Sequence, residues 1–380
     1  MLAPLVSLSR PRPDYLLLAF VGALVVIGLQ LVYSATFALA ITEYENVIYF
    51  LQRQAVWACI GTVLLLLLMR LDYHVWRVLA PVLLALTVAV LVLVLIPQFS
   101  VAQYGASRWL RLGPLPPVQP SEFVKLALVI GLAAWLSHPS HRPDRFYAGF
   151  LPPWVFLGVL TVMIMKQPDL GTALVILLTS TTVFFLAGAD VRSLALLCAG
   201  GIVAGGALIG SASYRVERWA SFLDPWQDPA GIGFHIIQLL IALGSGGIFG
   251  LGVGASRQKF FYVPGAHTDG IFAILGEELG LVGCLVVILL YAGLVYRGAR
   301  IVQQAPDLFG QLLAAGVISW IAYQTLVNIG GITRSIPLTG IPLPFLSYGG
   351  SSLAATLAAI GILLNISRQS VPSHSGGGSG

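Results

Sequence analysis

The chain has 380 residues, of which 57% are hydrophobic and only 9% are charged, and its formal net charge is +5. The mean hydropathy is +0.90. A soluble domain of this composition could not cover its surface with polar groups, so a soluble protein is excluded. No nucleic-acid partner is expected. Apolar runs of about 18 or more residues recur, and in lipid such runs form helices because only helices satisfy their own backbone.

We predict an all-α polytopic membrane protein in which residues 1–372 form one domain with ten transmembrane helices. The predicted spans lie near residues 15–37, 49–69, 76–97, 121–137, 151–167, 170–188, 193–211, 270–296, 309–331 and 345–366. A large extracytoplasmic loop, 212–269, separates the seventh and eighth helices. The first span is expected to be a retained anchor, because no small-residue cleavage site follows it. Residues 373–380 resemble an appended flexible linker.

Lys and Arg in the short loops indicate the orientation, because such loops are richer in these residues on the cytoplasmic side. Ten bases lie on the side of the termini: Arg10, Arg12, Arg70, Arg77, Arg142, Arg145, Arg192, Arg297, Arg300 and Arg368. Both termini are therefore predicted to be cytoplasmic. The other ten lie on or near the outer side: Arg53, Arg108, Arg111, Lys125, Lys166, Arg215, Arg218, Arg257, Lys259 and Arg334. Either the orientation is wrong, or these bases share an anionic ligand, and their spread over several segments favours the ligand.

Two early outer segments contain paired polar residues. Arg108 and Trp109 lie in an outer loop and are typical of an interfacial aromatic ring with snorkelling arginines. Glu122 and Lys125 open the fourth span three residues apart, so they share a helix face and can pair. Such a pair is either structural, or Lys125 faces a phosphate while Glu122 holds the lysine in position.

Asp169 and the three cysteines have simple structural interpretations. Asp169 precedes the sixth span and is predicted to be a helix N-cap, although Lys166 beside it leaves a polar cavity open as an alternative. The cysteines lie inside apolar runs without disulfide or metal spacing, so we expect small buried hydrophobic residues.

The loop 212–269 is the most polar long stretch of the chain. Its Asp-Pro pairs at Asp224 and Asp228 are predicted to start turns. Residues 234–243 are apolar but too short to span, which favours a helix at the outer interface. The glycine-rich segment 244–254 follows no strand and does not fit a dinucleotide-binding fingerprint, so we predict tight backbone packing.

The loop ends in His267-Thr268-Asp269-Gly270, directly before the eighth span. Asp269 lies at the positive end of that helix, where an anion is favoured, and a helix N-cap is the alternative. Glu277 and Glu278 follow about two turns further along, where carboxylates are costly unless they face a wet cavity or a basic partner. We therefore predict a polar, outward-opening site here. The small residues around Ser351 would add hydroxyl groups beside a cavity.

These motifs resemble the SEDS family of RodA and FtsW proteins in bacterial elongation and division. The matching segments are Pro120–Lys125 (PSEFVK), Gln167–Thr172 (QPDLGT), Gly244–Gly247 (GSGG), His267–Asp269 (HTD), Gly276–Gly280 (GEELG) and Leu343–Ser352 (LPFLSYGGSS). They follow the family order and cover essentially the whole membrane portion, and ten spans is the family's architecture. Phe222–Trp226 (FLDPW) resembles the division-type FtsW more than RodA.

The resemblance implies a peptidoglycan glycosyltransferase that polymerises lipid II into β-1,4 glycan strands on the outer face of the bacterial cytoplasmic (inner) membrane. Undecaprenyl pyrophosphate is the product released. The implied partners are a class B penicillin-binding protein, which cross-links the strands, and other divisome or elongasome membrane proteins. A divalent cation, Mg or Mn, is a candidate cofactor, and no residue is assigned to it.

The family's essential aspartate corresponds to Asp269, for which we hypothesise the role of general base toward the attacking sugar hydroxyl. Bases would neutralise the leaving pyrophosphate. The candidate substrate-binding residues are Arg53, Arg108, Trp109, Glu122, Lys125, Asp169, Arg215, Arg218, Gln238, His267 and Ser351.

The chain departs from the family pattern at four positions. The family usually has Glu where Gly265 stands and a bulky apolar residue where Gly270 stands. His235 replaces a common Gln, and Arg334 replaces a small residue. The lost glutamate argues against a second carboxylate beside Asp269.

Two other functions compete with the enzyme. A lipid II flippase would need polar residues through both leaflets, whereas the inner halves of the predicted spans are nearly free of charge. A non-catalytic scaffold of the cell-wall synthesis complex would leave Asp269 and the deep glutamates without a reason to be ionisable.

Overall fold

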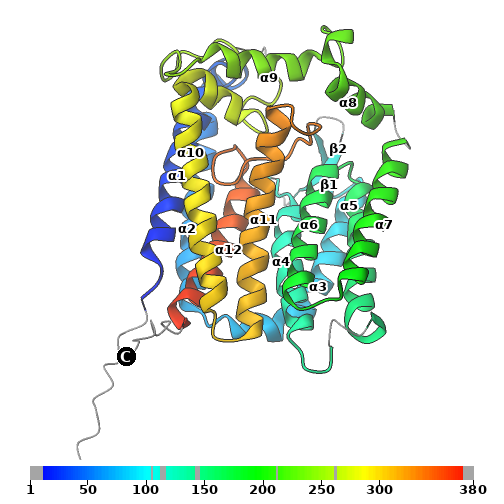
Figure 1. The fold of residues 1–380 in the computed structure, drawn as a ribbon. Coiled ribbons are helices and arrows are strands. Elements are labelled where there is room, and N and C mark those ends of the chain that lie inside the picture. The colour runs from blue at the N-terminus through cyan, green and yellow to red at the C-terminus, as the bar shows by residue number, and fades with distance from the viewer. Residues whose placement is uncertain are drawn as a thin grey trace, which may run out of the picture.

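The computed structural model describes residues 12–103, 106–111, 117–141, 146–210, 213–260 and 263–370. The helices form an upright bundle, and α8 (Ser213–Leu223) and α9 (Phe234–Ser245) lie across one end of it (Figure 1). Helix α1 begins and α12 ends at the opposite end of the bundle. Residues 1–11 and 371–380, which include the predicted linker, lie outside the described residues, as do the side chains of Arg215 and its neighbours in 213–215.

Ten helices overlap the ten predicted spans: α1 (Tyr15–Tyr44), α2 (Tyr49–Arg70), α3 (His74–Leu95), α4 (Pro120–Leu136), α5 (Leu151–Met165), α6 (Leu170–Leu186), α7 (Val191–Gly210), α10 (Ile271–Gln304), α11 (Leu308–Ile332) and α12 (Gly350–Gln369). Six of them, α1, α2, α3, α10, α11 and α12, are long and apolar enough to cross a membrane. The other four do not meet that criterion over the described residues. The multi-helix membrane class is confirmed, and the number of spans stays a prediction.

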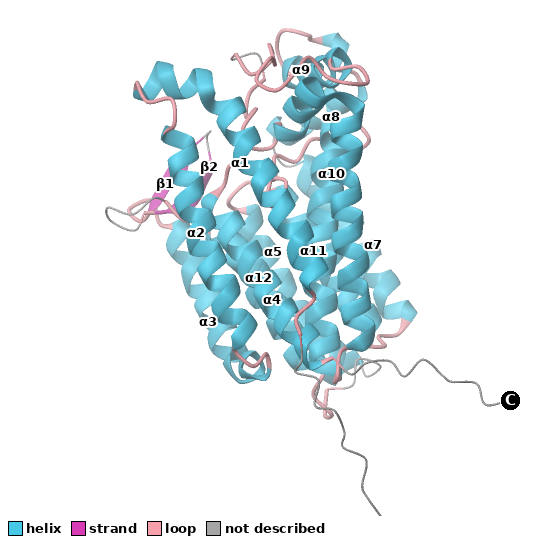
Figure 2. Cartoon of the chain, turned by 90° about the vertical axis from the view of Figure 1, so that its left-hand side faces the viewer, coloured by secondary structure: helices cyan, strands magenta, loops and turns pink. Residues whose placement is uncertain are grey.

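A short antiparallel hairpin adds strands to a chain that was predicted to be all helical (Figure 2). Strand β1 (Ser100–Gln103) pairs with β2 (Ala106–Leu110), and Val101 lies opposite Trp109. The hairpin lies between α3 and α4, at the end of the bundle rather than along its length. Open strand edges are tolerated there because water can satisfy them, whereas lipid cannot. A π-helical turn, η1 (Phe146–Phe150), and a 3-10 turn, η2 (Pro225–Gln227), complete the elements.

Helices α11 and α12 form the centre of the bundle. Their apolar windows are 78% and 89% buried, against 22% to 33% for α1, α2, α3 and α10. Small residues allow this close packing, as a side chain at Gly361 of α12 would approach the backbone carbonyl oxygen of Leu65 in α2 to 2.6 Å. Cys284 is buried as expected, but Cys59 and Cys198 are exposed. The prediction was wrong for those two because the outer faces of these helices carry apolar side chains turned away from the core.

Helix α10 is broken at Gly280, which has φ 66° and ψ −164°. The break frees backbone groups that pair with the glycine-rich segment 244–254. Four hydrogen bonds join them: Leu251 N to Glu277 O (2.9 Å), Gly252 N to Glu278 O (3.0 Å), Leu281 N to Gly247 O (2.9 Å) and Val282 N to Ile248 O (3.1 Å). A side chain at Gly280 would collide with the backbone of Gly250 and Ile248. The prediction of tight backbone packing for this segment is confirmed.

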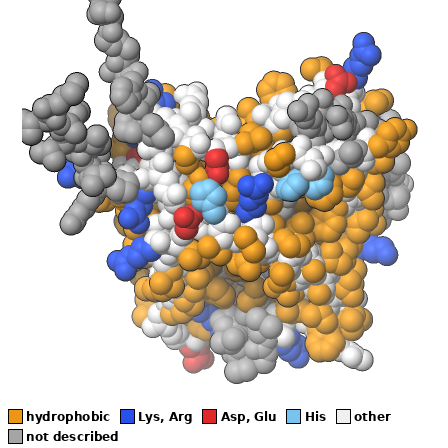
Figure 3. All heavy atoms as spheres, turned by 90° about the horizontal axis from the view of Figure 1, so that it is seen from below, with side chains coloured by type: hydrophobic (Ala, Val, Ile, Leu, Met, Phe, Trp, Pro, Cys, Tyr) orange, Lys and Arg blue, Asp and Glu red, His pale blue; other side chains and the backbone are white. Residues whose placement is uncertain are grey.

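Basic side chains surround the end of the bundle at which α1 begins and α12 ends. Figure 3 looks onto that end and shows Lys and Arg side chains spread among a smaller number of acidic ones. The distribution is consistent with a cytoplasmic face under the short-loop rule. The opposite end carries α8, α9 and the turn that contains Asp269.

Candidate functional site

A tight turn, 263–270, presents Asp269 at the start of α10. Gly265 adopts φ +65°, and its carbonyl oxygen accepts hydrogen bonds from Thr268 N (2.9 Å) and Gly270 N (3.1 Å). The N-cap of α10 is Gly270, without a side-chain cap, so the N-cap explanation for Asp269 is wrong. The Asp269 carboxylate is only partly buried, and its Oδ1 accepts from Thr268 Oγ1 (3.0 Å).

Gly265 suits the conformation of this turn. A side chain at that position would collide with Asp269 Oδ1 and lie 2.9 Å from Thr268 Oγ1. The positive φ is also unfavourable for any residue with a Cβ. In this turn the carboxylate of Asp269 occupies the space that a side chain at position 265 would need.

Arg218 of α8 brings a positive charge to the other side of Asp269. Its Nη1 donates to Leu338 O (3.5 Å) and Thr339 O (3.3 Å). A Cβ built on Gly340 would lie 3.7 Å from Asp269 Oδ2 and 4.0 Å from Arg218 Nη2. The glycine thus leaves both charged groups facing the same small space, where an anionic group could approach the guanidinium.

Arg334 fixes α8 in this position. It lies at the end of α11, and its guanidinium donates to Phe222 O (2.9 Å) and Leu223 O (2.7 Å), the last carbonyls of α8. Carbonyls at a helix C-terminus lack intrahelical partners, so a cation is favoured there. The residue that departs from the family pattern is therefore the one that caps α8 and holds Arg218 over the site.

His235 of α9 faces the same two charges. Burial lowers its pKa, the Arg218 guanidinium adds to this effect, and the Asp269 carboxylate opposes it. The Nε2 of His235 is buried without a hydrogen-bond partner. A neutral ring with one unpaired nitrogen is thus present near Asp269.

Five rings form an aromatic wall at the turn: Tyr44, Tyr49, Phe50, His267 and Tyr348. The His267 ring lies 5.6 Å from Phe50 and 5.7 Å from Tyr348, centroid to centroid. Burial lowers the pKa of His267 to about 4, although Asp269 opposes the shift. His267 is therefore neutral and packs as one ring of the aromatic wall. Arg53 stacks on Tyr49 at 4.5 Å. Burial raises the pKa of Tyr348, and the nearby Arg53 charge only partly offsets this rise.

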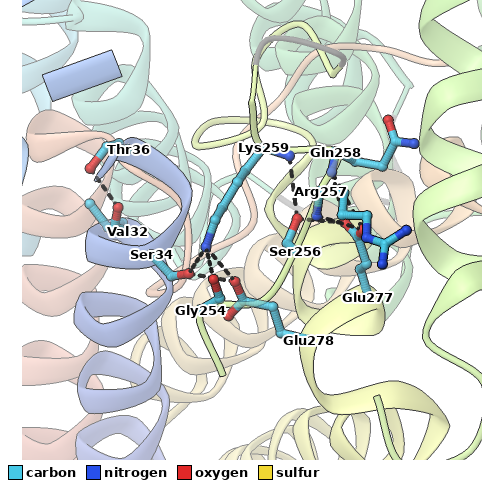
Figure 4. Close-up of polar contacts among 10 residues, drawn as sticks. All are labelled: Val32, Ser34, Thr36, Gly254, Ser256, Arg257, Gln258, Lys259, Glu277 and Glu278. Atoms are coloured by element: carbon cyan, nitrogen blue, oxygen red, sulfur yellow. Dashed lines mark hydrogen bonds and ion pairs between the residues drawn. The ribbon is translucent and has the colours of Figure 1, made fainter. Parts of the chain in front are cut away.

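Of the two alternatives predicted for Glu277 and Glu278, a wet cavity or a basic partner, the structure shows the basic partner for Glu278 and backbone donors for Glu277. Figure 4 shows both turned toward the loop that precedes the turn. Glu277 accepts from Ser256 Oγ (2.5 Å) and Arg257 N (2.9 Å). Glu278 pairs with Lys259 Nζ (3.1 Å) and accepts from Ser34 Oγ of α1 (2.5 Å). The basic partner of Glu278 is thus Lys259, which does not face outward.

Other predicted site residues lie in structural contacts elsewhere. Asp169 caps α6 through Thr172 N (3.1 Å), so the N-cap prediction is confirmed. Arg108 donates to Gln167 O (3.0 Å) and also to Pro168 O. Ser351 Oγ accepts from Gln119 N (3.0 Å).

Glu122 and Lys125 form a buried ion pair at 2.9 Å in α4. Trp109 is part of β2, and Gln238 is partly buried on α9, three residues after His235. Arg215 lies outside the described side chains. For all these residues, a role in substrate binding stays a prediction.

The fold and the site define a polytopic helical membrane protein that presents one carboxylate at the end of its bundle, between basic, imidazole and aromatic side chains. Over residues 14–371 the chain matches the family model FTSW_RODA_SPOVE, described as a cell cycle protein. The chain belongs to the FtsW/RodA/SpoVE family, and the resemblance noted in the sequence is confirmed.

Relatives and solved structures agree with this membership. The chain is 45% identical over 362 residues to stage V sporulation protein E of Bacillus subtilis, covering 95% of this chain and 99% of the relative. It is 44% identical to the probable peptidoglycan glycosyltransferase FtsW of Trichlorobacter lovleyi, covering 93% of each. The crystal structure of Thermus thermophilus rod shape determining protein RodA matches with TM-score 0.70 and 30% identity, covering 96% and 98%.

A chain from a structure named for the coordination of polymerization and crosslinking by a peptidoglycan synthase complex matches with TM-score 0.77. Its identity to this chain is 30%, and the match covers 95% of this chain and 99% of that one. The FtsW relatives support the FtsW-like character predicted from Phe222–Trp226.

Proposed function

We propose that this protein is a peptidoglycan glycosyltransferase that polymerises lipid II into β-1,4 glycan strands and releases undecaprenyl pyrophosphate. Family membership supports the proposal, because relatives at 40% to 44% identity carry the name probable peptidoglycan glycosyltransferase FtsW. The observation that carries it is the Asp269 carboxylate. It caps no helix, is partly exposed and faces the same space as the Arg218 guanidinium.

In the proposed reaction, a hydroxyl oxygen of the acceptor sugar bonds to the anomeric carbon of the donor sugar. The bond from that carbon to the phosphate oxygen breaks, and the pyrophosphate leaves with the polyprenyl chain. Asp269 takes the hydroxyl proton as general base, a role that supplies about 10²–10⁴-fold in rate. Arg218 is the described base best placed to stabilise charge on the leaving group, with Arg53 at the aromatic wall as a second candidate.

We further propose ten spans, with both termini in the cytoplasm and the loop 212–269 on the outer face. The ten helices and the basic end of the bundle support this topology. It would place Asp269 in the bacterial cytoplasmic membrane at the level where a lipid-linked sugar meets water. The aromatic wall is consistent with such an interface, because Tyr is enriched there.

The proposed partner is a class B penicillin-binding protein transpeptidase, with other divisome or elongasome membrane proteins around it. The matching chain from a peptidoglycan synthase complex supports it. The described residues hold no group of three or more His, Cys, Asp and Glu side chains that could bind a metal ion. A divalent cation, Mg or Mn, stays a proposed cofactor. Such a cation would need the diphosphate oxygens of the substrate as further ligands.

The test is glycan polymerisation from purified lipid II in proteoliposomes, with and without the class B partner. We expect Asp269→Asn to lower the rate by about 10²–10⁴-fold, because the amide cannot take the proton. The matched control is Asp224→Asn in the same loop. Asp224 is exposed, and among the described hydrogen bonds its carboxylate accepts only from Trp226 N (3.1 Å), so the rate of this variant should change little.

Full polymerisation by Asp269→Asn would show that the base is another group. If the wild type made no polymer even with partner and divalent cation present, translocation of labelled lipid II in the same liposomes would separate the alternatives. Translocation would favour a flippase, and its failure would favour a scaffold.

A further inference from the structure

Helix α11 carries three buried polar side chains four residues apart, which we call the α11 polar row: Trp320, Gln324 and Asn328. Their exposed fractions are 1%, 1% and 3%. Residues at this spacing lie on one face of a helix. Polar groups inside a membrane helix are costly and are expected to have specific partners. The backbone acceptors of Gln324 and Asn328 lie in two segments at the site, the turn 263–270 and the link 338–342, and Gln324 also contacts Lys125 of α4.

Asn328 joins those two segments directly. Its Nδ2 donates to the carbonyl oxygen of Asp269 (3.0 Å) and to that of Ile341 (2.8 Å). Ile341 is the neighbour of Gly340, the residue that faces both Asp269 and Arg218. One amide group therefore fixes the backbone on both sides of the space into which the carboxylate points.

Gln324 extends the connection toward α4. Its Nε2 donates to Pro342 O (2.9 Å), the next carbonyl of the same link. Its Oε1 accepts from Trp320 Nε1 (2.7 Å) and from Lys125 Nζ (2.7 Å). Lys125 in turn pairs with Glu122 at 2.9 Å. A continuous chain of hydrogen bonds thus runs from the buried ion pair to the link beside Asp269.

The surroundings of Lys125 leave no room for a phosphate. The cavity lined by Lys125, Thr179 and Trp320 holds about 10 Å³, enough for about one water molecule. An ammonium group has three donors, of which Glu122 and Gln324 take two. Thr179 Oγ1 is buried without a partner and could share that water with the third donor.

We propose that Gln324 and Asn328 are positioning residues for the reaction, and that the Glu122–Lys125 pair acts on Asp269 through them rather than by touching substrate. The inference rests on the proposed function, because it concerns the same carboxylate. It differs from the substrate-binding role predicted for Lys125 and Glu122, and it assigns roles to two amides that carry no charge.

The first experiment compares Asn328→Leu with wild type in the proteoliposome assay. We expect kcat to fall by at least about tenfold with little change in KM for lipid II, since a displacement of about 1 Å can cost about 100-fold in rate. The control is Thr325→Val on the same helix. Thr325 is equally buried but bonds only within α11, to Ile321 O (2.8 Å), so kcat should stay near wild type.

The second experiment separates positioning from phosphate contact. Lys125→Met leaves the Glu122 carboxylate buried without its cation, and we expect polymerisation to fall at least about tenfold. Adding Glu122→Gln removes that charge, and the double variant should recover most of the loss. A double variant as inactive as Lys125→Met would mean that the ammonium contacts substrate, which would overturn the inference for the ion pair.

The Asp269→Asn variant in the same assay distinguishes failure of the proposed glycosyltransferase function from failure of the positioning role. If that variant is active, the proposed function fails, whatever Asn328→Leu does. If it is inactive while Asn328→Leu keeps both kcat and the folded fraction of wild type, only the positioning role is wrong.

Discussion

At the scale of single residues, the site depends on glycines as much as on charged groups. Gly265 turns the chain with a positive φ, and Gly340 leaves open the space between Asp269 and Arg218. Neither contributes chemistry of its own. Gly265 allows the Asp269 carboxylate to lie where a Cβ would otherwise be, whereas a Cβ at Gly340 would be in ordinary contact with Asp269 and Arg218, at 3.7 and 4.0 Å. Substitution at either position tests the geometry without removing any functional group.

We predict that Gly265→Ala lowers polymerisation strongly, because the new methyl group would displace the Asp269 carboxylate. The control is Gly188→Ala, where φ is +86° and nothing lies within 4 Å of the added carbon. Both variants should lose about 1–2 kcal/mol of stability from backbone strain. Thermal unfolding and the polymerisation assay separate the two effects. Equal activity in both variants would show that Gly265 matters only to the backbone.

At the scale of elements, two deep glutamates of α10 hold the loop that leads to the site. Glu277 binds the backbone of Arg257 and the hydroxyl of Ser256, and Glu278 binds Lys259 and Ser34 (Figure 4). The Lys259 and Glu278 side chains are 3% and 2% exposed. The loop, α1 and the broken helix α10 are therefore tied by one buried ion pair and its hydrogen bonds.

We predict that Lys259→Met destabilises the protein by about 3–5 kcal/mol, because it leaves the Glu278 charge buried and unpaired. The double variant Lys259→Met with Glu278→Gln should recover much of the lost stability, because it leaves no unpaired charge buried. Arg257→Ala is the control: its side chain is exposed, and its backbone bond to Glu277 remains. The free energy of unfolding in detergent is measured for all three variants. A double variant no more stable than Lys259→Met would contradict the ion-pair account.

At the scale of the whole molecule, the site lies at the end of the bundle opposite the basic end (Figures 1 and 3). The central pair of helices, α11 and α12, is the most buried and carries the polar row that reaches the site. The outer helices expose apolar side chains around this core. The proposed chemistry therefore requires one orientation in the membrane.

We predict that a cysteine introduced at Glu43 reacts in intact cells with a membrane-impermeant maleimide, whereas one at Gln303 reacts only after permeabilisation. Both positions are exposed, at opposite ends of the bundle. The native cysteines are replaced by alanine in both variants. The reverse labelling pattern would place Asp269 in the cytoplasm and would contradict an outer-face polymerase.

The sequence alone determined the membrane class, the approximate positions of the long helices and the family, and it predicted Asp269 as the candidate catalytic residue. These follow from features that are local in the chain: hydrophobic length, glycine and proline turns, and motifs read in order. The Asp169 cap and the turns at Asp224 and Asp228 were predictable for the same reason, because each carboxylate bonds to backbone a few residues away.

Only the tertiary structure decided which polar groups meet. Glu278 and Lys259 both looked like parts of an open site, yet they pair with each other, because the break at Gly280 folds the glycine-rich segment back onto α10. Asn328 lies 59 residues from Asp269, and no spacing rule links them. In a membrane bundle any side chain on the inner face of a helix can reach several others. The partner is decided by how the helices pack and by the need of buried polar groups for one another.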